Sequence, residues 1–179
     1  MLARHDGPAL RDVLAAVNKP SQNLHAELLL RLLGARVKGA GTAEAGLAAL
    51  REFLQRAGVH LEGSDLRDGS GLSPFGLLTP RLLVDLLAHM DRHPQAAVFK
   101  ASLPLAGVDG TLKNRLKGTR AEGHVLAKTG AIAHVAALAG YATTRRGERV
   151  AFAVFVNHQA GPAAEATAAV DAFVRALVE

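Results

Sequence analysis

Residues 124–143 read HVLAKTGAIAHVAALAGYAT, and this stretch decides the fold. Its pattern predicts a strand from His124 to Thr129 that ends in Lys128-Thr129-Gly130, then a tight turn and a second strand from 134 to 144. Lys128 would then lie at a strand end, where a fixed cation, a hydroxyl and backbone N–H groups can bind one anion. We therefore expect the chemistry of this protein at this point of the chain.

The residues that follow complete a small sheet and cover it. A third strand is predicted at 149–157, after the polar turn 145–148. Residues 150–156, VAFAVFV, are apolar on both faces, so other elements should cover both sides of this strand. A last helix begins at Gly161-Pro162 and should direct four apolar side chains inward, namely Val170, Phe173, Val174 and Leu177. The prediction is an α+β fold with a three-strand antiparallel meander and a C-terminal helix packed on it.

Helices dominate the first half of the chain. Apolar periodicity and capping residues predict helices at 8–17, 24–33, 42–57 and 79–92, a turn of helix near Phe99, and a short helix at 111–117. Residues 62–76 are rich in Gly, Ser and Asp and should form a loop. The helix 24–33 contains so many leucines that it should be central, with Glu27 and Arg31 paired and Gly34 ending it.

Composition limits the class of protein. The 179 residues are 49% hydrophobic, which is enough for one domain over residues 1–179, and the absence of cysteine excludes disulfides and thiolate metal sites. The opening residues carry charge where a signal peptide needs an apolar run, and no stretch is long enough to span a membrane. Although the net charge is +5, Lys and Arg are scattered without interleaved aromatics, so we expect no nucleic-acid partner.

Two short motifs can carry chemistry, and each also has a purely structural interpretation. Lys128-Thr129-Gly130 can be an ordinary strand end followed by a turn, and Ser21-x-Asn23 can be a helix N-cap. The pair His89 and His93 has the i,i+4 spacing of zinc ligands, but no third ligand is evident, and a surface histidine pair is the better interpretation. His124 and His134 can border the site around Lys128, although a partly buried structural histidine is the better interpretation of each. Asp68 more plausibly holds a turn than takes part in acid–base catalysis.

Taken together and in this order, the motifs resemble a known family. A Ser-x-Asn before an apolar helix and a Lys-Thr-Gly on a later strand are two of three signatures of penicillin-binding proteins and serine β-lactamases. The strings at 18–31, 68–73, 103–112 and 128–141 narrow the resemblance to the D-Ala-D-Ala carboxypeptidase/endopeptidase branch of low-molecular-mass penicillin-binding proteins. It covers nearly the whole chain, and it implies the C-terminal portion of a penicillin-binding-protein/β-lactamase-like transpeptidase domain.

The resemblance also implies roles for individual residues. Ser21 relays a proton to the leaving amine, Asn23 bonds the substrate peptide, and Lys128 supplies positive charge. Thr129, Gly130 and Ala131 would bind the substrate, with the Thr129 side chain on its terminal carboxylate and the Ala131 N–H as one oxyanion donor. The implied ligands are D-Ala-D-Ala stem peptides of peptidoglycan and, in the intact parent, β-lactams. No cofactor or metal is implied.

Two differences from the sequence pattern of this family change the expected activity. The third signature, Ser-x-x-Lys, supplies the acylated serine, yet none of the five serines has a lysine three residues later: Ser21, Ser64, Ser70, Ser73 and Ser102. In addition, Ala131 stands where this branch usually has a threonine. We therefore expect the C-terminal piece of an extracytoplasmic enzyme, inactive alone and with the N-terminal part as a potential partner. The rival hypotheses are a non-catalytic module that binds peptidoglycan peptides or a partner chain, and a basic nucleic-acid binder.

Overall fold

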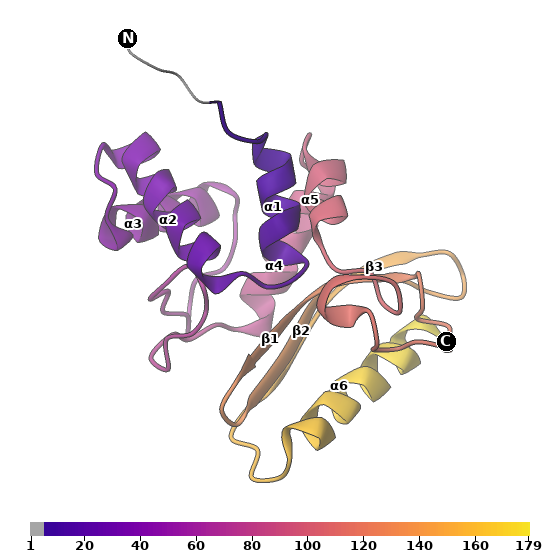
Figure 1. Cartoon of the computed structure of the whole chain (residues 1–179). Helices are drawn as coiled ribbons and strands as arrows, with labels where there is room; N and C mark the ends of the chain where they lie inside the picture. The colour runs from indigo at the N-terminus through magenta and orange to yellow at the C-terminus, as the bar shows by residue number, and fades with distance from the viewer. Residues whose placement is uncertain (1–5) are drawn as a thin grey trace.

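The computed structural model describes residues 6–179, in which helices come first and a small sheet second (Figure 1). The helices are α1 Leu10–Asn18, α2 Asn23–Lys38, α3 Ala43–Arg56, α4 Pro80–Arg92, α5 Ala96–Ser102, the 3-10 helix η1 Gly110–Leu112, and α6 Ala163–Val178. The strands are β1 Val125–Ile132, β2 Val135–Thr143 and β3 Arg149–Val156. Within the described residues, no helix is both long and apolar enough to cross a bilayer.

The three strands form one antiparallel sheet in the order β1-β2-β3, which is the predicted meander. The ladder between β1 and β2 continues to the pair Ile132 and Val135, so the hairpin turn is Ala133-His134. Lys128 lies in the middle of β1, opposite Ala139. The prediction that β1 ends at the Lys-Thr-Gly motif was therefore wrong, because the residues after the motif still find ladder partners in β2.

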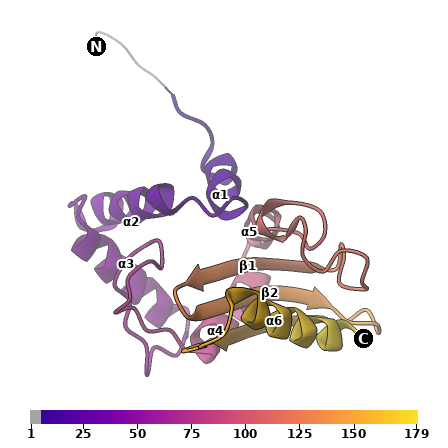
Figure 2. The same cartoon turned by 60° about the horizontal axis from the view of Figure 1, so that its bottom comes forward.

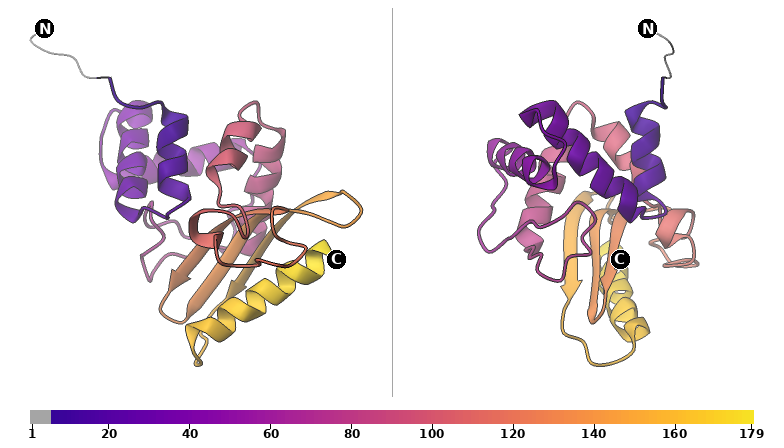
Figure 3. Two further views of the ribbon diagram at one scale, coloured as in Figure 1. Left: turned by 45° about the vertical axis from the view of Figure 1, so that its right-hand side comes forward. Right: turned by 60° about the vertical axis from the view of Figure 1, so that its left-hand side comes forward.

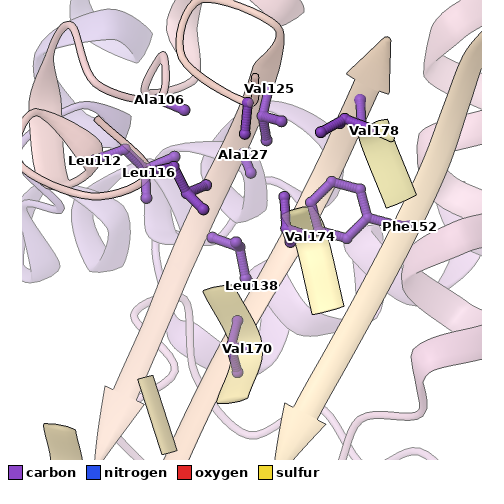
Figure 4. Close-up of a cluster of buried hydrophobic side chains, with 12 residues drawn as sticks. Ala106, Leu112, Leu116, Val125, Ala127, Leu138, Phe152, Val170, Val174 and Val178 are labelled. Carbon is purple, nitrogen blue, oxygen red and sulfur yellow. The ribbon is translucent and has the colours of Figure 1, made fainter. Parts of the chain in front are cut away.

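Helices cover both faces of the sheet, as predicted for β3. Helix α4 packs against β3 and β2 on one face, and α6 lies along the opposite face (Figure 2). Figure 4 shows side chains from the loop before β1, from all three strands and from α6 converging in the core on the α6 side. The buried positions of α6 recur at i,i+4 spacing and are Ala166, Val170, Val174 and Val178. Phe173, predicted to face inward, is 46% exposed because it falls outside that stripe.

Helices α2 and α3 form a closely packed pair. Helix α2 continues through Gly34, where we predicted its end, and stops at Lys38 before Gly39, which is left-handed with φ 74°. A Cβ on Gly34 would lie 2.7 Å from the backbone nitrogen of Gly46 in α3, and a Cβ on Gly46 would lie 2.2 Å from the carbonyl oxygen of Leu30. Both glycines therefore permit a close helix crossing, and Gly34 does not terminate a helix.

Helix α2 is not central, contrary to the prediction from its leucines. It packs mainly on α3, and both views of Figure 3 show this purple pair apart from the yellow α6. Three leucines at i,i+4 spacing are exposed: Leu24 by 68%, Leu28 by 52% and Leu32 by 47%. We call these residues the α2 stripe. An apolar row of this kind on the outside of a protein usually marks a contact surface.

Several local predictions were confirmed and others were wrong. Thr42 and Thr79 cap α3 and α4 through their hydroxyls, as predicted, and α4 runs from Pro80 to Arg92. Helix α1 begins two residues later than Pro8, and the predicted helix 111–117 is only η1 followed by turns. Glu27 does not pair with Arg31, because its Oε1 accepts the backbone N–H groups of Gly69 and Ser70 at 3.0 and 2.9 Å.

Exposure of the α2 stripe should make the purified chain self-associate or bind a hydrophobic dye. Changing Leu24, Leu28 and Leu32 together to glutamine removes most of that apolar surface, so dye fluorescence and the apparent mass in light scattering should both fall. The single change Phe173→Gln, at an exposed apolar residue on α6, serves as a control and should have little effect. A monodisperse wild-type monomer that binds no dye would contradict this prediction.

Candidate active site

The structure brings the two short motifs together. Lys128 of β1 and Ser21 of the turn between α1 and α2 are 107 residues apart in sequence, and Lys128 Nζ donates a 2.7 Å hydrogen bond to Ser21 Oγ. Lys128 Nζ also donates to the carbonyl oxygen of Thr129 at 2.9 Å. A hydroxyl oxygen in direct contact with a cation can pass a proton onward with little movement of either group.

Ser21 is held in an unusual backbone conformation. Its φ is 64°, in the left-handed region, which costs a residue other than glycine about 1–2 kcal/mol. The next residue is fixed by a hydrogen bond from Gln22 N–H to the carbonyl oxygen of Val17. Strain of this kind persists only where neighbouring contacts enforce it, and it is concentrated at functional sites.

An ion pair between distant residues enforces this turn. Lys19 Nζ lies 2.5 Å from Asp109 Oδ2 and donates to the carbonyl oxygen of Leu103 at 3.2 Å. Asp109 Oδ1 accepts the N–H of Leu105 at 2.9 Å. Burial alone would raise the pKa of the Asp109 carboxyl, but the hydrogen bonds from Lys19 and Leu105 hold it below its usual value. We call Lys19 with Asp109 the Lys19–Asp109 clamp.

The outer edge of β1 is open beside this turn. The N–H of Ala127 donates to the carbonyl oxygen of Pro104, so the backbone of Ala127 faces away from β2. Alternate residues of a strand direct their backbone groups to the same edge, so the N–H groups of Thr129 and Ala131 also face outward. In the described chain β1 is an edge strand, and no strand pairs with it on this side. Beyond the isolated bridge between Leu105 and Leu126, the edge therefore offers the outward N–H groups of Thr129 and Ala131 to a ligand.

A second hydroxyl lies next to the motif and was missed from the sequence. Thr129 Oγ1 and Thr111 Oγ1 are 2.9 Å apart and share a hydrogen bond. Thr111 follows Asp109 and Gly110 in a string that supported the family resemblance, but nothing in the string indicated contact with β1. The clamp residues Lys19 and Asp109 were missed for the same reason, because a contact between distant segments leaves no pattern within either segment.

The remaining predicted site residues lie at the same edge or near it. Asn23 is the first residue of α2, and its exposed amide has no hydrogen-bond partner among residues 6–179. Gly130 and Ala131 are exposed on β1. Two shallow hollows, of about 160 and 280 Å³, lie elsewhere, next to Asp91 and next to Asp171. A ligand of the motif residues would lie along the open edge of β1.

The other candidates stay apart from this site. The rings of His89 and His93 are 5.8 Å apart, and no group of His, Asp or Glu within residues 6–179 is arranged to hold a metal ion. His124 precedes β1 and contacts the carbonyl oxygen of Glu122, while His134 lies in the hairpin turn. Asp68 accepts the N–H groups of two residues in its own loop, which supports the turn-holding role.

Burial lowers the pKa of Lys128 below its ordinary value of 10.5. The folded chain therefore binds this proton less readily than the unfolded chain, so the buried charge lowers stability at neutral pH. That penalty disappears as the pH rises through the folded value and past about 10.5. Lys128→Met should accordingly melt at a higher temperature than wild type at neutral pH, with a difference that vanishes above this pH.

Thermal melts of both proteins across this pH range would check the prediction for Lys128. The exposed Lys113→Met serves as the matched control, with the same chemical change on the surface. A lower melting temperature for Lys128→Met at neutral pH would contradict the prediction, because the hydrogen bonds to Ser21 and Thr129 would then outweigh the cost of burial.

Comparisons with known proteins show which family the chain is similar to. A family model described as D-Ala-D-Ala carboxypeptidase 3 (S13) matches residues 1–177. A D-alanyl-D-alanine carboxypeptidase from Actinomadura sp. (strain R39) is 45% identical over 168 residues, which cover 91% of this chain and 31% of that protein. The chain spans about a third of the length of the curated relatives it matches.

Solved structures agree with the fold. The crystal structure of penicillin binding protein 4 from Haemophilus influenzae, in complex with a β-lactam, superposes with a TM-score of 0.81 at 32% identity over 94% of this chain and 40% of that one. A class A β-lactamase from Bacteroides cellulosilyticus shares the fold, with a TM-score of 0.67 at 21% identity over 95% of this chain and 62% of that one. The predicted fold class and the resemblance drawn from the short motifs are confirmed, and the chain belongs to the D-Ala-D-Ala carboxypeptidase 3 (S13) family.

Proposed function

We propose that residues 1–179 form the C-terminal part of a serine-type D-Ala-D-Ala carboxypeptidase/endopeptidase domain that acts on peptidoglycan stem peptides. The observation that carries this proposal is the 2.7 Å hydrogen bond between Lys128 Nζ and Ser21 Oγ at the open edge of β1. It supports a working half-site made by two motifs that are far apart in sequence. The acylated serine would come from polypeptide outside these residues, because the chain contains no Ser-x-x-Lys.

The three catalytic residues would act on the leaving group and the peptide. Ser21 relays a proton toward the departing D-alanine, and the neighbouring Lys128 cation favours the proton transfer through its charge. The free amide of Asn23 bonds the substrate peptide. Because Ser21 already touches Lys128, little reorganisation is needed when substrate arrives.

The substrate would lie along the edge of β1 as an added strand. Extended peptides bind exposed strand edges through main-chain hydrogen bonds, and the outward N–H groups of Thr129 and Ala131 are of the required kind. Lys128 and Thr129 extend to opposite faces of β1, so a terminal carboxylate at the edge lies between them. Gly130 leaves room there, since it has no side chain.

The chemistry itself is acyl transfer that this chain can only assist. The missing serine attacks the penultimate D-Ala carbonyl, terminal D-alanine leaves, and water releases the acyl-enzyme. Ala131 N–H would be one of two oxyanion donors, and the loss of one such donor costs about two to three orders of magnitude in rate. β-Lactams would acylate the same serine in the intact parent, which would work outside the cytoplasmic membrane. No cofactor or metal enters this scheme.

Binding of a stem-peptide mimic tests the proposal. Diacetyl-L-Lys-D-Ala-D-Ala should bind the purified chain saturably in an NMR titration, and Lys128→Ala should abolish the binding by removing the cation that faces the carboxylate. Lys38→Ala, which removes a surface lysine paired with Glu52 on the far end of α2, should bind like wild type. Absence of binding by the wild-type chain, or full binding by Lys128→Ala, would refute the proposal.

Peptide binding alone leaves one rival, a non-catalytic module for peptidoglycan peptides or for a partner chain. The exposed α2 stripe is the observation that favours it, since such a surface suits a partner. DNA sequence upstream of the Met1 codon separates the two. An in-frame Ser-x-x-Lys would support the split-enzyme proposal, and its absence would favour the binding module.

A further inference from the structure

Counting hydrogens at the site shows which donors remain for a ligand. The ammonium group of Lys128 has three N–H donors, of which one bonds Ser21 Oγ and one bonds the carbonyl oxygen of Thr129. Within residues 6–179 no other acceptor bonds this nitrogen. One charged donor is therefore left for an anion at the edge of β1.

The hydroxyl pair leaves a second donor. Thr129 and Thr111 share one hydrogen bond, which uses one hydrogen, so one of the two O–H groups stays free. Neither hydroxyl bonds another group in the described part of the chain. Ala131, the next residue of β1 on the same face as Thr129, carries no hydroxyl. The strand thus supplies one hydroxyl at this edge, and Thr111 supplies the other from a different segment.

We propose that Thr111 is a second hydroxyl of the carboxylate subsite and that the Lys19–Asp109 clamp holds it there. This inference rests on the proposed function, in which the edge of β1 binds a terminal carboxylate. Thr111 bonds that carboxylate directly, or Thr111 polarises the Thr129 hydroxyl, which then bonds the carboxylate. Lys19 and Asp109 touch no substrate and act as positioning residues.

The backbone around Thr111 ties it to the turn that carries Ser21. Thr111 N–H donates to the carbonyl oxygen of Lys19 at 2.9 Å. A Cβ on Gly110, whose φ is 56°, would lie 2.6 Å from that same oxygen, so glycine is required for the close approach. Any shift of Lys19 therefore moves Thr111 and Ser21 together.

The same segment is also tied to β1. Asp109 Oδ1 holds the N–H of Leu105, and Leu105 forms an isolated antiparallel bridge with Leu126 of β1. Asp109 thus contacts the turn through Lys19 and the strand through Leu105. Breaking the clamp should loosen Thr111 relative to Thr129 without removing either hydroxyl.

Comparison of a peptide acid with its amide isolates the carboxylate subsite. NMR titrations of the full chain would use diacetyl-L-Lys-D-Ala-D-Ala and its C-terminal carboxamide. Thr111→Val keeps the side-chain shape and should weaken binding of the acid about tenfold, the usual effect of one hydrogen bond to a charged group, while leaving the amide unchanged. Thr111→Ser should restore acid binding, and Thr111→Ala repeats the loss without a branched side chain.

The clamp is tested by a double-mutant cycle. Asp109→Asn should weaken binding of the acid more than of the amide, and Thr111→Val should add little in that background, because coupled residues are not additive. Asp171→Asn is the matched control, since it breaks a half-buried ion pair with Arg115 that joins α6 to the loop after Thr111. It should change the melting temperature without changing the acid-to-amide ratio.

Each result separates the inference from the proposed function. Wild-type binding with an unchanged affinity in Thr111→Val overturns the role of Thr111 alone, as does an equal loss for acid and amide. Equal behaviour of Asp109→Asn and Asp171→Asn overturns the role of the clamp. No binding of the acid by wild type overturns the proposed function and, with it, this inference.

Discussion

A β-lactam added in excess to the 179-residue chain should form no covalent adduct, and a D-Ala-D-Ala peptide incubated with it should release no D-alanine. The physical reason is that the chain has no Ser-x-x-Lys serine to accept the acyl group. Ser21 is the serine that touches Lys128, and in the proposed mechanism its hydroxyl passes a proton to the leaving group and does not accept the acyl group. Loss of a serine nucleophile lowers turnover by about six orders of magnitude in serine hydrolases, which puts any residual rate below detection.

Intact-protein mass spectrometry and a D-alanine release assay would check this expectation. An intact carboxypeptidase of the same family, treated in parallel, should be acylated and should release D-alanine. An adduct on the chain would contradict the prediction, and Ser21→Ala would then show whether Ser21 carries it. Measured turnover by the purified polypeptide would also end the idea that it is an incomplete site.

Gly140→Ala adds one methyl group and should lower the stability of this protein more than any other glycine-to-alanine change. A Cβ at Gly140 would lie 2.0 Å from the carbonyl oxygen of Leu126 and 2.6 Å from the Cα of Ala127. Both atoms belong to the backbone of β1, so no side-chain rotation relieves the overlap and the two strands must separate. We expect a loss of about 3 kcal/mol or more in the free energy of unfolding.

Urea unfolding of Gly140→Ala and wild type would measure this loss. Gly41→Ala is the control, because a Cβ there meets only the Ala35 Cβ at 3.9 Å, and its effect should be near zero or slightly stabilising. Since Ala127 precedes Lys128, the same substitution should also pull Lys128 away from Ser21 and weaken peptide binding. Wild-type stability in Gly140→Ala would contradict this close approach of β1 and β2.

Local signals in the sequence were sufficient for many elements. Thr79, Pro80 and the apolar spacing that follows predicted the start and the approximate end of α4, because capping and periodicity act over a single helical turn. The apolar run of β3 predicted cover on both faces, and α4 and α6 provide it. The family resemblance was also accessible, since it depends on short motifs and on their order along the chain.

Elements that depend on distant partners were placed less well. Gly34 carried a helix-stop signal, yet the helix continues because Gly46 of α3 packs against that glycine. Gly130 carried a turn signal, yet β1 continues because Ala136 and Val135 complete the ladder. In both cases a weak local preference of about 1 kcal/mol is outweighed by packing or ladder bonds with residues elsewhere in the chain.

The same distinction between local signals and distant contacts applies to the candidate site. By itself, the sequence determined the residue types that carry the chemistry, a serine, an amide and a lysine in motifs of known order, because these can be recognised within three or four positions. Only the tertiary structure decided that Ser21 and Lys128 meet, that Thr111 joins Thr129, and that the Lys19–Asp109 clamp holds the turn. Contacts over 18 to 107 positions form only when the sheet and the helices pack, so no local pattern encodes them.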